Sequence, residues 1–338
     1  MLRALPLVAA FGLAPSLSQA DPLPALNLTL GETTVSGLSS GAFMAVQLQV
    51  AFSGAISGAG IVAGGPYGCA DGNVYRAVRV CMNAFLGEAD AGDAIEDILA
   101  LSAEGAIDNP TNLAGHRLYL FHGMSDDTVD RASMNALSET YELLGVPGEQ
   151  IIYETNIDAG HGFVTERGDL SCSTTDPDFL IDCDFDQAGD ILNQLYPGLS
   201  DASEPREASF VTFDQSLYLN GAQGMDETGF VYIPESCAGG APCKLHIALH
   251  GCKQGREVIG EDYARLTGYN RWAEANDIVV LYPQALKIPS SWWNWFGGNP
   301  NGCWDWWGYA GDDYLSQNAP QIAAIARMAA ILGARLGP

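Results

Sequence analysis

The alternation of short apolar runs with helix-like stretches constrains the fold of this chain more than any other feature. The runs are rich in Val, Ile and Leu, which is typical of strands buried on both faces of a parallel sheet. They span residues 34–37, 56–63, 117–121, 150–154, 229–234, 245–250 and 277–282. Helical patterns lie between some of them, at 43–52, 131–144 and, as the longest, 315–336. This order predicts an α/β fold with a mostly parallel central sheet flanked by helices.

The start of the chain has the features of an export signal. The basic Arg3 is followed by an apolar run at 4–13 and by the small-residue stretch Ser18-Gln19-Ala20. The run is too short to cross a bilayer as a helix, which favours a signal peptide over a membrane anchor. We therefore expect residues 1–20 to be a signal peptide and the protein to be secreted, into the medium or the periplasm. Residues 21–338 are expected to form one domain, because no repeat or Pro-rich linker divides them.

The chain is strongly acidic, with 41 Asp and Glu against 15 Lys and Arg and a net charge of −26 at pH 7. Such a surface repels phosphate backbones, so nucleic acid is not an expected partner. No later stretch has the length and apolarity of a membrane span, so no membrane association is expected. The acidic surface favours solubility and does not exclude a neutral substrate.

The sequence contains 8 cysteines, and an even number in an exported chain favours disulfide bonds. Bonding each cysteine to its sequence neighbour is the simplest of the many possible connectivities. The resulting pairs are Cys69–Cys81, Cys172–Cys183, Cys237–Cys243 and Cys252–Cys303.

A metal site is the alternative use of these residues, and we do not expect one. The sequence has no Cys-x-x-Cys pair and no histidine at ligand spacing from a cysteine. A cluster of aspartates could bind calcium, but its spacing differs from that of an EF-hand loop, which favours a solvated acidic loop. The cluster consists of Asp176, Asp178, Asp182, Asp184 and Asp186.

Gly37-Leu38-Ser39-Ser40-Gly41 matches the motif Gly-x-Ser-x-Gly. The motif alone is weak evidence, because a chain rich in Gly and Ser can contain it by chance. Its context is stronger: the β-branched Val35 precedes it and a helix-forming run at 42–48 follows, as a nucleophile elbow requires. The small residues 37 and 41 let the strand and the helix approach closely. We predict that Ser39 is a nucleophile; the alternative is a plain Gly-Ser turn.

A nucleophilic serine needs an imidazole to accept its proton and a carboxylate to orient that imidazole. In the order typical of α/β-hydrolases, the acid follows the serine and the histidine comes last. His161 fits this order, since it lies in a flexible loop after the run 150–154. Asp126 is the first carboxylate after the run 117–121, at the strand end where the triad acid belongs. Asp127 is the second choice, and Asp158 is interpreted as a turn residue.

Two backbone N–H groups are expected to stabilise the oxygen of the tetrahedral intermediate. Ser40, which follows the nucleophile, supplies one. Cys252 supplies the other, because the run 245–250 ends in His-Gly, as oxyanion loops often begin. This run lies far after Ser39 instead of before it. Moving residues 229–336 in front of Leu26 restores the usual order, so we predict a circular permutation.

An aromatic segment near the C-terminal end contains every tryptophan except Trp272. Glycines and prolines within it predict a loop, and loops at the carboxyl edge of a parallel sheet line active sites. Indole rings suit a ligand with alternating methyl and ester groups, and also suit sugars. About half of the rings are expected to pack into the core instead. The aromatic residues are Trp292, Trp293, Trp295, Phe296, Trp304, Trp306, Trp307 and Tyr309.

Several longer stretches resemble the single-domain, circularly permuted poly(3-hydroxybutyrate) depolymerases of the α/β-hydrolase superfamily. They are VSGLSSGAFMAVQL, AGGPYGCA, the Gly-x-Ser-Asp-x-Thr-Val pattern at 123–129, the His161 loop, ALHGC, LTGYNRWA, LYPQA and NPNGCWDW. Together they extend over nearly the whole chain after residue 20 and are far more specific than Gly-x-Ser-x-Gly. A modest departure is Gly41-Ala42, where the family often has two glycines.

The resemblance implies the same roles that the motifs indicate, for Ser39, Asp126 and His161 as the triad and for Ser40 and Cys252 as oxyanion donors. It also implies that Trp306 contacts the polymer, and its neighbours Trp304 and Trp307 are further candidates for substrate binding. The implied reaction is hydrolysis of a polyester to 3-hydroxybutyrate and short oligomers through an acyl-enzyme. No cofactor is implied, and we expect a monomer without a separate polymer-binding domain.

Two other functions are compatible with parts of this pattern. Feruloyl and acetyl-xylan esterases share the secreted fold and clefts rich in tryptophan, and would use the same chemistry on polysaccharide esters. A secreted binding protein with an inert triad is the alternative from another class. The number of matching stretches favours the polyester, and the intact triad and oxyanion elements argue against the binding protein.

Overall fold

Within residues 20–289 and 298–336, which the computed structural model describes, a central 8-stranded sheet has the order β4-β3-β2-β1-β10-β11-β9-β8. Each run that the sequence predicts as a strand overlaps one of these strands. Their bounds are β1 (Leu28–Leu38), β2 (Ile56–Val62), β3 (Arg117–Phe121), β4 (Ile151–Glu154), β8 (Phe210–Asp214), β9 (Thr228–Tyr232), β10 (Cys243–Leu249) and β11 (Ile278–Tyr282). The predicted signal peptide, apart from Ala20, lies outside the described residues.

The strands from β4 to β11 run parallel, and β9 and β8 complete the sheet in antiparallel pairing. The predicted mostly parallel α/β fold is therefore confirmed. The prediction is wrong for residues 229–234, because β9 is antiparallel to its neighbour β11. An apolar run indicates that a strand is buried, but it does not indicate whether the strand runs parallel or antiparallel to its neighbours. The edge strand β8 is partly exposed, which is why its apolar pattern is weak and the sequence analysis missed it.

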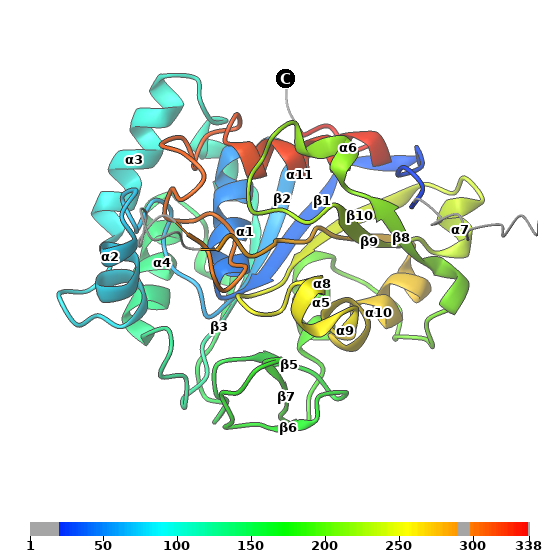
Figure 1. Cartoon of the computed structure of the whole chain (residues 1–338), viewed down its shortest axis with the longest axis horizontal. Helices are drawn as coiled ribbons and strands as arrows, with labels where there is room; N and C mark the ends of the chain where they lie inside the picture. The colour runs from blue at the N-terminus through cyan, green and yellow to red at the C-terminus, as the bar shows by residue number, and fades with distance from the viewer. Residues whose placement is uncertain (1–19, 290–297, 337–338) are drawn as a thin grey trace, which may run out of the picture.

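Helices cover both faces of the sheet, as Figure 1 shows. One face packs against α1 (Ser40–Ala51), α3 (Ala91–Ala103), α4 (Arg131–Leu143) and α11 (Pro320–Leu332). The other packs against α5 (Gln187–Leu195), α9 (Asp262–Leu266) and α10 (Tyr269–Asn276). Side chains alternate between the two cores along a strand, so Val279 and Leu281 of β11 enter the first core and Val280 enters the second.

The final helix is shorter than the sequence analysis predicts. Helix α11 is 13 residues long, as are α3 and α4, and it does not extend over the whole of residues 315–336. Pro320 is the first helical residue, where its fixed φ is favourable and its missing N–H has no partner to lose. Gly333 follows the helix with φ 115°, a conformation that ends helices because it is open mainly to glycine.

Shorter elements connect these layers. A second sheet with the order β5-β7-β6 follows β4, and it lies at the bottom of the view in Figure 1. Its strands are β5 (Phe163–Val164), β6 (Leu170–Ser171) and β7 (Leu180–Asp182). The remaining elements are α2 (Val74–Arg76), α6 (Ser216–Leu219), α7 (Glu235–Ala238), α8 (Arg256–Ile259), the π-helical turn η1 (Ala77–Met82) and the 3₁₀ turns η2 (Pro110–Gly115), η3 (Gly148–Gln150) and η4 (Glu207–Ser209).

The sheet order agrees with the predicted circular permutation. β10, which leads into His250-Gly251, lies directly beside β1, which leads into Ser39. The Leu26 N–H donates to the Leu332 carbonyl at 3.1 Å, so the end of α11 meets the chain just before β1. The predicted boundary at residue 229 needs correction, because β8 pairs with β9 and belongs to the same half. The junction between the halves therefore lies before Phe210.

Four disulfide bonds join the cysteines. Each cysteine is bonded to its sequence neighbour, which is the pairing that the sequence analysis chose. Among the His, Cys, Asp and Glu side chains of the described ranges, one group of three lies close enough together to share a metal ion. It consists of Cys237, Cys243 and Asp277. The two sulfurs are bonded to each other and are not thiolate ligands. No described helix has the length and apolarity needed to cross a bilayer.

Candidate active site

Ser39 lies in a sharp turn between the end of β1 and the start of α1. Its backbone has φ 57° and ψ −121°, a conformation that costs roughly 1–3 kcal/mol for a residue with a side chain. A Cβ placed on Gly37 would lie 2.2 Å from the carbonyl oxygen of Gly41. A Cβ on Gly41 would lie 2.4 Å from the carbonyl oxygen of Leu249 in β10. Both positions therefore require glycine, and the close packing of strand and helix holds the strained turn.

Asp126 lies in the loop that follows β3, with a side chain that is 1% exposed. Its Oδ1 accepts the N–H groups of Thr128 and Val129 at 2.9 and 3.0 Å. Its Oδ2 lies 2.8 Å from His161 Nδ1. Burial by itself raises the pKa of the carboxyl, but the hydrogen bonds from His161 and the two amides outweigh burial and lower the pKa below its usual value. Asp126 is therefore ionised at neutral pH and accepts a hydrogen bond from His161 Nδ1.

His161 lies in the loop between β4 and β5, which packs against the Asp126 loop. The Ser125 N–H donates to the Ala159 carbonyl at 3.0 Å, and a Cβ on Gly123 would lie 2.1 Å from that oxygen. The backbone N–H of His161 itself donates to a threonine hydroxyl at 2.9 Å. Because the ionised Asp126 can only accept, the His161 proton is on Nδ1 and the lone pair is on Nε2. This is the tautomer that a general base needs.

Ser39 and His161 line the same cavity of about 340 Å³. Among the hydrogen bonds of the described residues, none joins Ser39 Oγ to His161 Nε2. Contacts between nucleophile and base are often loose before a substrate binds. The geometry therefore brings the three predicted triad residues to one site, and their catalytic roles stay predictions.

The two alternative carboxylates are placed differently from Asp126. Asp127 and Asp158 are both exposed. Of the three carboxylates, only that of Asp126 contacts the His161 imidazole. Asp158 accepts a hydrogen bond from the Ser125 hydroxyl, a contact that fits its interpretation as a turn residue. The geometry favours Asp126 as the partner of His161.

The two predicted oxyanion donors lie beside Ser39. Ser40 is the first residue of α1, where a helix leaves its backbone N–H groups without intrahelical partners. In the described part of the chain, neither the Ser40 N–H nor the Cys252 N–H has a hydrogen-bond acceptor. A Cβ on Gly251 would lie 3.4 Å from Ser39 Cβ, and Cys252 lines both cavities that contain Ser39. Both amides are therefore available near the nucleophile, as an oxyanion hole requires.

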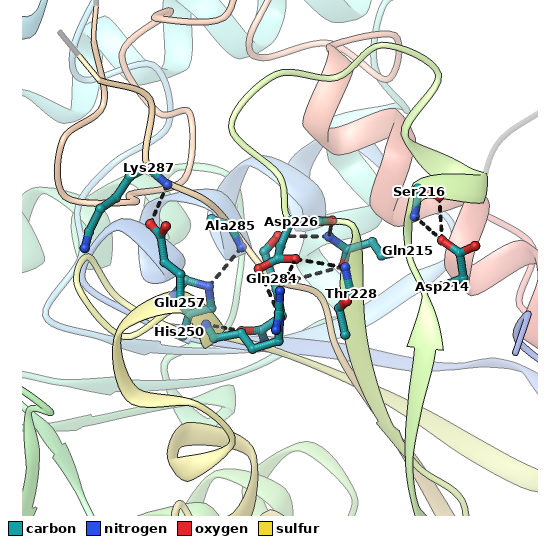
Figure 2. Close-up of polar contacts among 11 residues, drawn as sticks. Asp214, Gln215, Ser216, Asp226, Thr228, His250, Glu257, Gln284, Ala285 and Lys287 are labelled. Atoms are coloured by element: carbon teal, nitrogen blue, oxygen red, sulfur yellow. Dashed lines mark hydrogen bonds and ion pairs between the residues drawn. The ribbon is translucent and has the colours of Figure 1, made fainter. Parts of the chain in front are cut away.

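His250 holds the peptide that carries the Cys252 amide, and Figure 2 shows its surroundings. The Ala285 N–H donates to His250 Nε2 at 3.0 Å. Because Nε2 accepts, Nδ1 carries the ring proton and donates to the Gly251 carbonyl at 2.7 Å. Burial lowers the pKa of His250 to about 4, so the ring is neutral at neutral pH. The Gly251 carbonyl and the Cys252 N–H belong to one planar peptide, whose orientation His250 therefore restrains.

A polar network that is buried apart from the exposed Arg256 supports the segment that contains Ala285 (Figure 2). Arg256 donates to both carboxylate oxygens of Asp226, at 2.9 and 3.1 Å. The Gln284 N–H donates to Gln215 Oε1, and Gln215 Nε2 donates back to the Gln284 carbonyl, both at 2.9 Å. The Gln284 side chain also accepts the Arg256 N–H at 2.9 Å. This network fixes the backbone that restrains His250.

The expectation that Trp304 binds substrate is wrong. Its side chain is 0% exposed and does not line either cavity beside Ser39. The indole N–H donates to the His250 carbonyl at 2.9 Å, and the two rings lie 5.3 Å apart. Trp304 therefore supports the end of β10. The spacing of tryptophans along a loop does not reveal which ring faces the core.

Trp306 and Trp307 line a second, largely apolar cavity of about 330 Å³ that also contains Ser39. Trp306 stacks on Phe43, with ring centroids 4.0 Å apart and planes at 11°. Trp307 meets Trp306 nearly at right angles, with centroids 5.6 Å apart. These positions agree with a role in substrate contact. The other predicted aromatics Trp292, Trp293, Trp295 and Phe296 lie outside the described residues.

The sequence analysis missed two residues that shape the cavities. Phe43 lies four residues after Ser39 in the helix that follows the elbow, and that spacing alone places it near the nucleophile. Met82 lines both cavities. It follows Cys81, whose disulfide to Cys69 indicates only that these two segments are close, so no local signal pointed to Ser39.

Two curated proteins are similar to the chain in sequence. A poly(3-hydroxybutyrate) depolymerase of Delftia acidovorans is 42% identical over 319 residues, which cover 93% of this chain and 62% of that protein. A polyhydroxybutyrate depolymerase of Talaromyces funiculosus is 39% identical over 323 residues, which cover 93% of this chain and 91% of that protein. The chain thus spans less than two thirds of the Delftia protein. No protein-family model matches it.

Two solved structures are similar in fold. One is a PHB depolymerase in which a serine is replaced by alanine, complexed with an R3HB trimer. It matches with a TM-score of 0.83 and 37% identity, over 92% of this chain and 98% of that one. The other is a PHB depolymerase from Penicillium funiculosum, with a TM-score of 0.83, 38% identity and the same coverage.

Proposed function

The chain belongs to the family of poly(3-hydroxybutyrate) depolymerases, and from this membership we propose that it is a secreted esterase that hydrolyses this polyester. The products are 3-hydroxybutyrate and short oligomers. The observation that carries the proposal is the hydrogen bond of 2.8 Å between ionised Asp126 and His161, in a cavity that Ser39 shares. Four disulfide bonds support an oxidising compartment outside the cytosol.

Acylation begins with attack of Ser39 Oγ on an ester carbonyl carbon. As the new C–O bond forms, the hydroxyl proton moves to His161 Nε2, and Asp126 stabilises the imidazolium. The amides of Ser40 and Cys252 donate to the oxyanion. When the tetrahedral intermediate collapses, the ester C–O bond breaks and His161 returns the proton to the leaving alkoxide.

Deacylation repeats these steps with water as the nucleophile. Water loses a proton to His161 and attacks the acyl carbon, and the intermediate then expels Ser39 Oγ, which recovers that proton. The released acyl group is a carboxylic acid. No cofactor takes part in either half of the reaction.

The two cavities suggest how the substrate lies. The acyl part would occupy the apolar cavity lined by Trp306 and Trp307, where methyl groups pack against indole. The alcohol part would occupy the cavity lined by His161, because the leaving oxygen must reach the proton on that ring.

We expect the variant Ser39→Ala to lose hydrolysis of amorphous poly(3-hydroxybutyrate), because it lacks the hydroxyl that attacks the ester carbonyl. Its Tm should stay close to that of the wild type. Product release would be followed by chromatography of 3-hydroxybutyrate. A feruloyl ester and acetylated xylan serve as competing substrates in the same assay. Undiminished activity of Ser39→Ala, or hydrolysis of the polysaccharide esters alone, would contradict the proposed function.

A further inference from the structure

The two cavities beside Ser39 differ in their charged groups. Among the described residues that line it, the cavity of about 330 Å³ has no ionisable side chain, and it does not include His161. The cavity of about 340 Å³ has two, His161 and Lys253. We call the cavity of about 340 Å³ the leaving-group pocket, since the leaving alkoxide must lie where His161 can protonate it.

No carboxylate is among the described residues that line the leaving-group pocket, although the chain has 41 acidic residues and a net charge of −26. Lys253 is one of three lysines in the chain. It forms no ion pair with any described residue. Lys253 is exposed and lines this pocket, so it adds a positive charge beside a pocket whose surroundings repel anions.

Two contacts hold the backbone at Lys253 in place. Its N–H donates to the Asn301 carbonyl at 2.7 Å, and the preceding Cys252 is bonded to Cys303. Its φ of 64° lies in the left-handed region, which glycine adopts with less strain. Strained residues with side chains concentrate at functional sites, so a lysine here points to a use for its side chain.

The direction of the polyester decides which chain end reaches this lysine. Each ester joins the acyl carbon of one unit to the hydroxyl oxygen of the next. The alcohol part released in the first step therefore carries the end with the free carboxyl group. In a short oligomer this carboxyl group is ionised at neutral pH, because its pKa lies near 4.

We propose that Lys253 binds the terminal carboxylate of soluble 3-hydroxyacid oligomers and directs cleavage to ester bonds near that end. The inference rests on the proposed function, since it uses the protonation of the leaving group by His161. The ligand is an aliphatic carboxylate that is one or a few hydroxyacid units away from the scissile ester. Long polymer chains present few terminal carboxylates, so their hydrolysis depends on Lys253 much less than that of the oligomers.

The test compares a 3-hydroxybutyrate trimer as the free acid with the methyl ester of the same trimer. The variants are Lys253→Gln, which removes the charge, and Lys253→Arg, which keeps it. Lys244→Gln is the matched control, because it removes the same charge at the start of β10, away from the site. For each protein, the ratio of KM for the methyl ester to KM for the acid is measured at low salt, together with Tm.

We expect the wild type, Lys253→Arg and Lys244→Gln to prefer the acid by about threefold to fivefold, the range of a solvated ion pair. The ratio for Lys253→Gln should fall to about one, and salt at about 0.5 M should reduce the wild-type preference in the same way. An unchanged ratio in Lys253→Gln would overturn the proposal.

Failure of the proposed function gives a different result. In that case the wild type hydrolyses neither trimer. Calorimetric binding of the trimer acid to the wild type and to Lys253→Gln then tests the lysine separately from catalysis. Equal affinity of the two proteins for the acid would reject the carboxylate site.

Discussion

At the scale of single residues, the two buried imidazoles near Ser39, those of His161 and His250, differ in their hydrogen-bond partners. His161 donates from Nδ1 to an ionised carboxylate, whereas His250 donates from Nδ1 to the neutral carbonyl of Gly251. The Nε2 of His250 is occupied by the Ala285 N–H, and no described group occupies the Nε2 of His161. Only His161 therefore keeps a lone pair for proton transfer, and His250 is confined to positioning a backbone peptide.

We predict that Asp126→Asn lowers kcat on the order of 10⁴-fold at neutral pH with little change in KM. An asparagine can still accept from the Thr128 and Val129 amides, but it presents an N–H to His161. The ring then takes the tautomer with its proton on Nε2, which cannot accept the serine proton. Asp127→Asn is the matched control, because Asp127 is exposed, and its kcat should stay within about twofold. Steady-state kinetics on a soluble oligomer measure both.

The same substitution should change how stability depends on pH. The pKa of Asp126 is lower in the folded protein than in the unfolded chain, so its ionised form stabilises the fold. This contribution is fully present above the unfolded pKa near 4 and is lost as pH falls through the folded value. Asp126→Asn should therefore lose stability above about pH 4 and show a smaller decline in Tm on acidification. An equal acid decline in both proteins would contradict this assignment.

At the scale of elements, the site depends on the contact of α1 with β1 and β10. Gly37 and Gly41 leave no room for a Cβ between the strand ends and the first turn of the helix. All of α1 is buried, so the helix cannot shift outward to make room. The position of Ser39 is therefore coupled to that of Gly251 at the end of β10.

Gly41→Ala should destabilise the fold by about 3 kcal/mol or more and abolish activity in whatever protein folds. The added methyl group would lie 2.4 and 2.5 Å from two backbone carbonyl oxygens of residues 249 and 250. Gly115→Ala is the control, because its Cβ would meet nothing within 4 Å. Urea unfolding and ester hydrolysis would be measured for both. Wild-type stability of Gly41→Ala would show that α1 and β10 can separate.

At the scale of the whole molecule, the two halves of the sheet are exchanged in the chain relative to the order typical of α/β-hydrolases. The strands β8 to β11 come after β4 in the sequence, yet β10 lies beside β1 in the sheet. The end of α11 and the chain before β1 are joined by the hydrogen bond of Leu26 to Leu332. A short linker can therefore connect these ends without moving either half.

A permutant that links Leu336 to Asp21 and opens the chain between Glu204 and Pro205 should fold and stay active. The opening lies in an irregular exposed segment before β8, so no strand is cut. We expect its Tm to lie within about 5 °C of the wild type. A permutant opened at Ile247, in the middle of β10, should not fold. Loss of folding in the first permutant would contradict the proximity of the two ends.

Much of the fold and the candidate site is predictable from local patterns. The apolar runs predict where strands lie, because burial of both faces selects apolar side chains. The elbow at Ser39 is predictable because tight turns need glycine. Three of the four disulfides join cysteines only 6 to 12 residues apart, which short loops bring together. The order of Ser39, Asp126 and His161 is likewise readable from the ends of predicted strands.

Tertiary structure alone decided the direction of β9, the place of the edge strand β8 and the burial of Trp304. It also decided that Lys253 shares a pocket with His161. These features depend on contacts between segments far apart in the chain, whereas periodicity records only local burial and backbone conformation. A loop residue has no periodic neighbour that reveals its direction, so its role becomes visible only when distant segments pack against it.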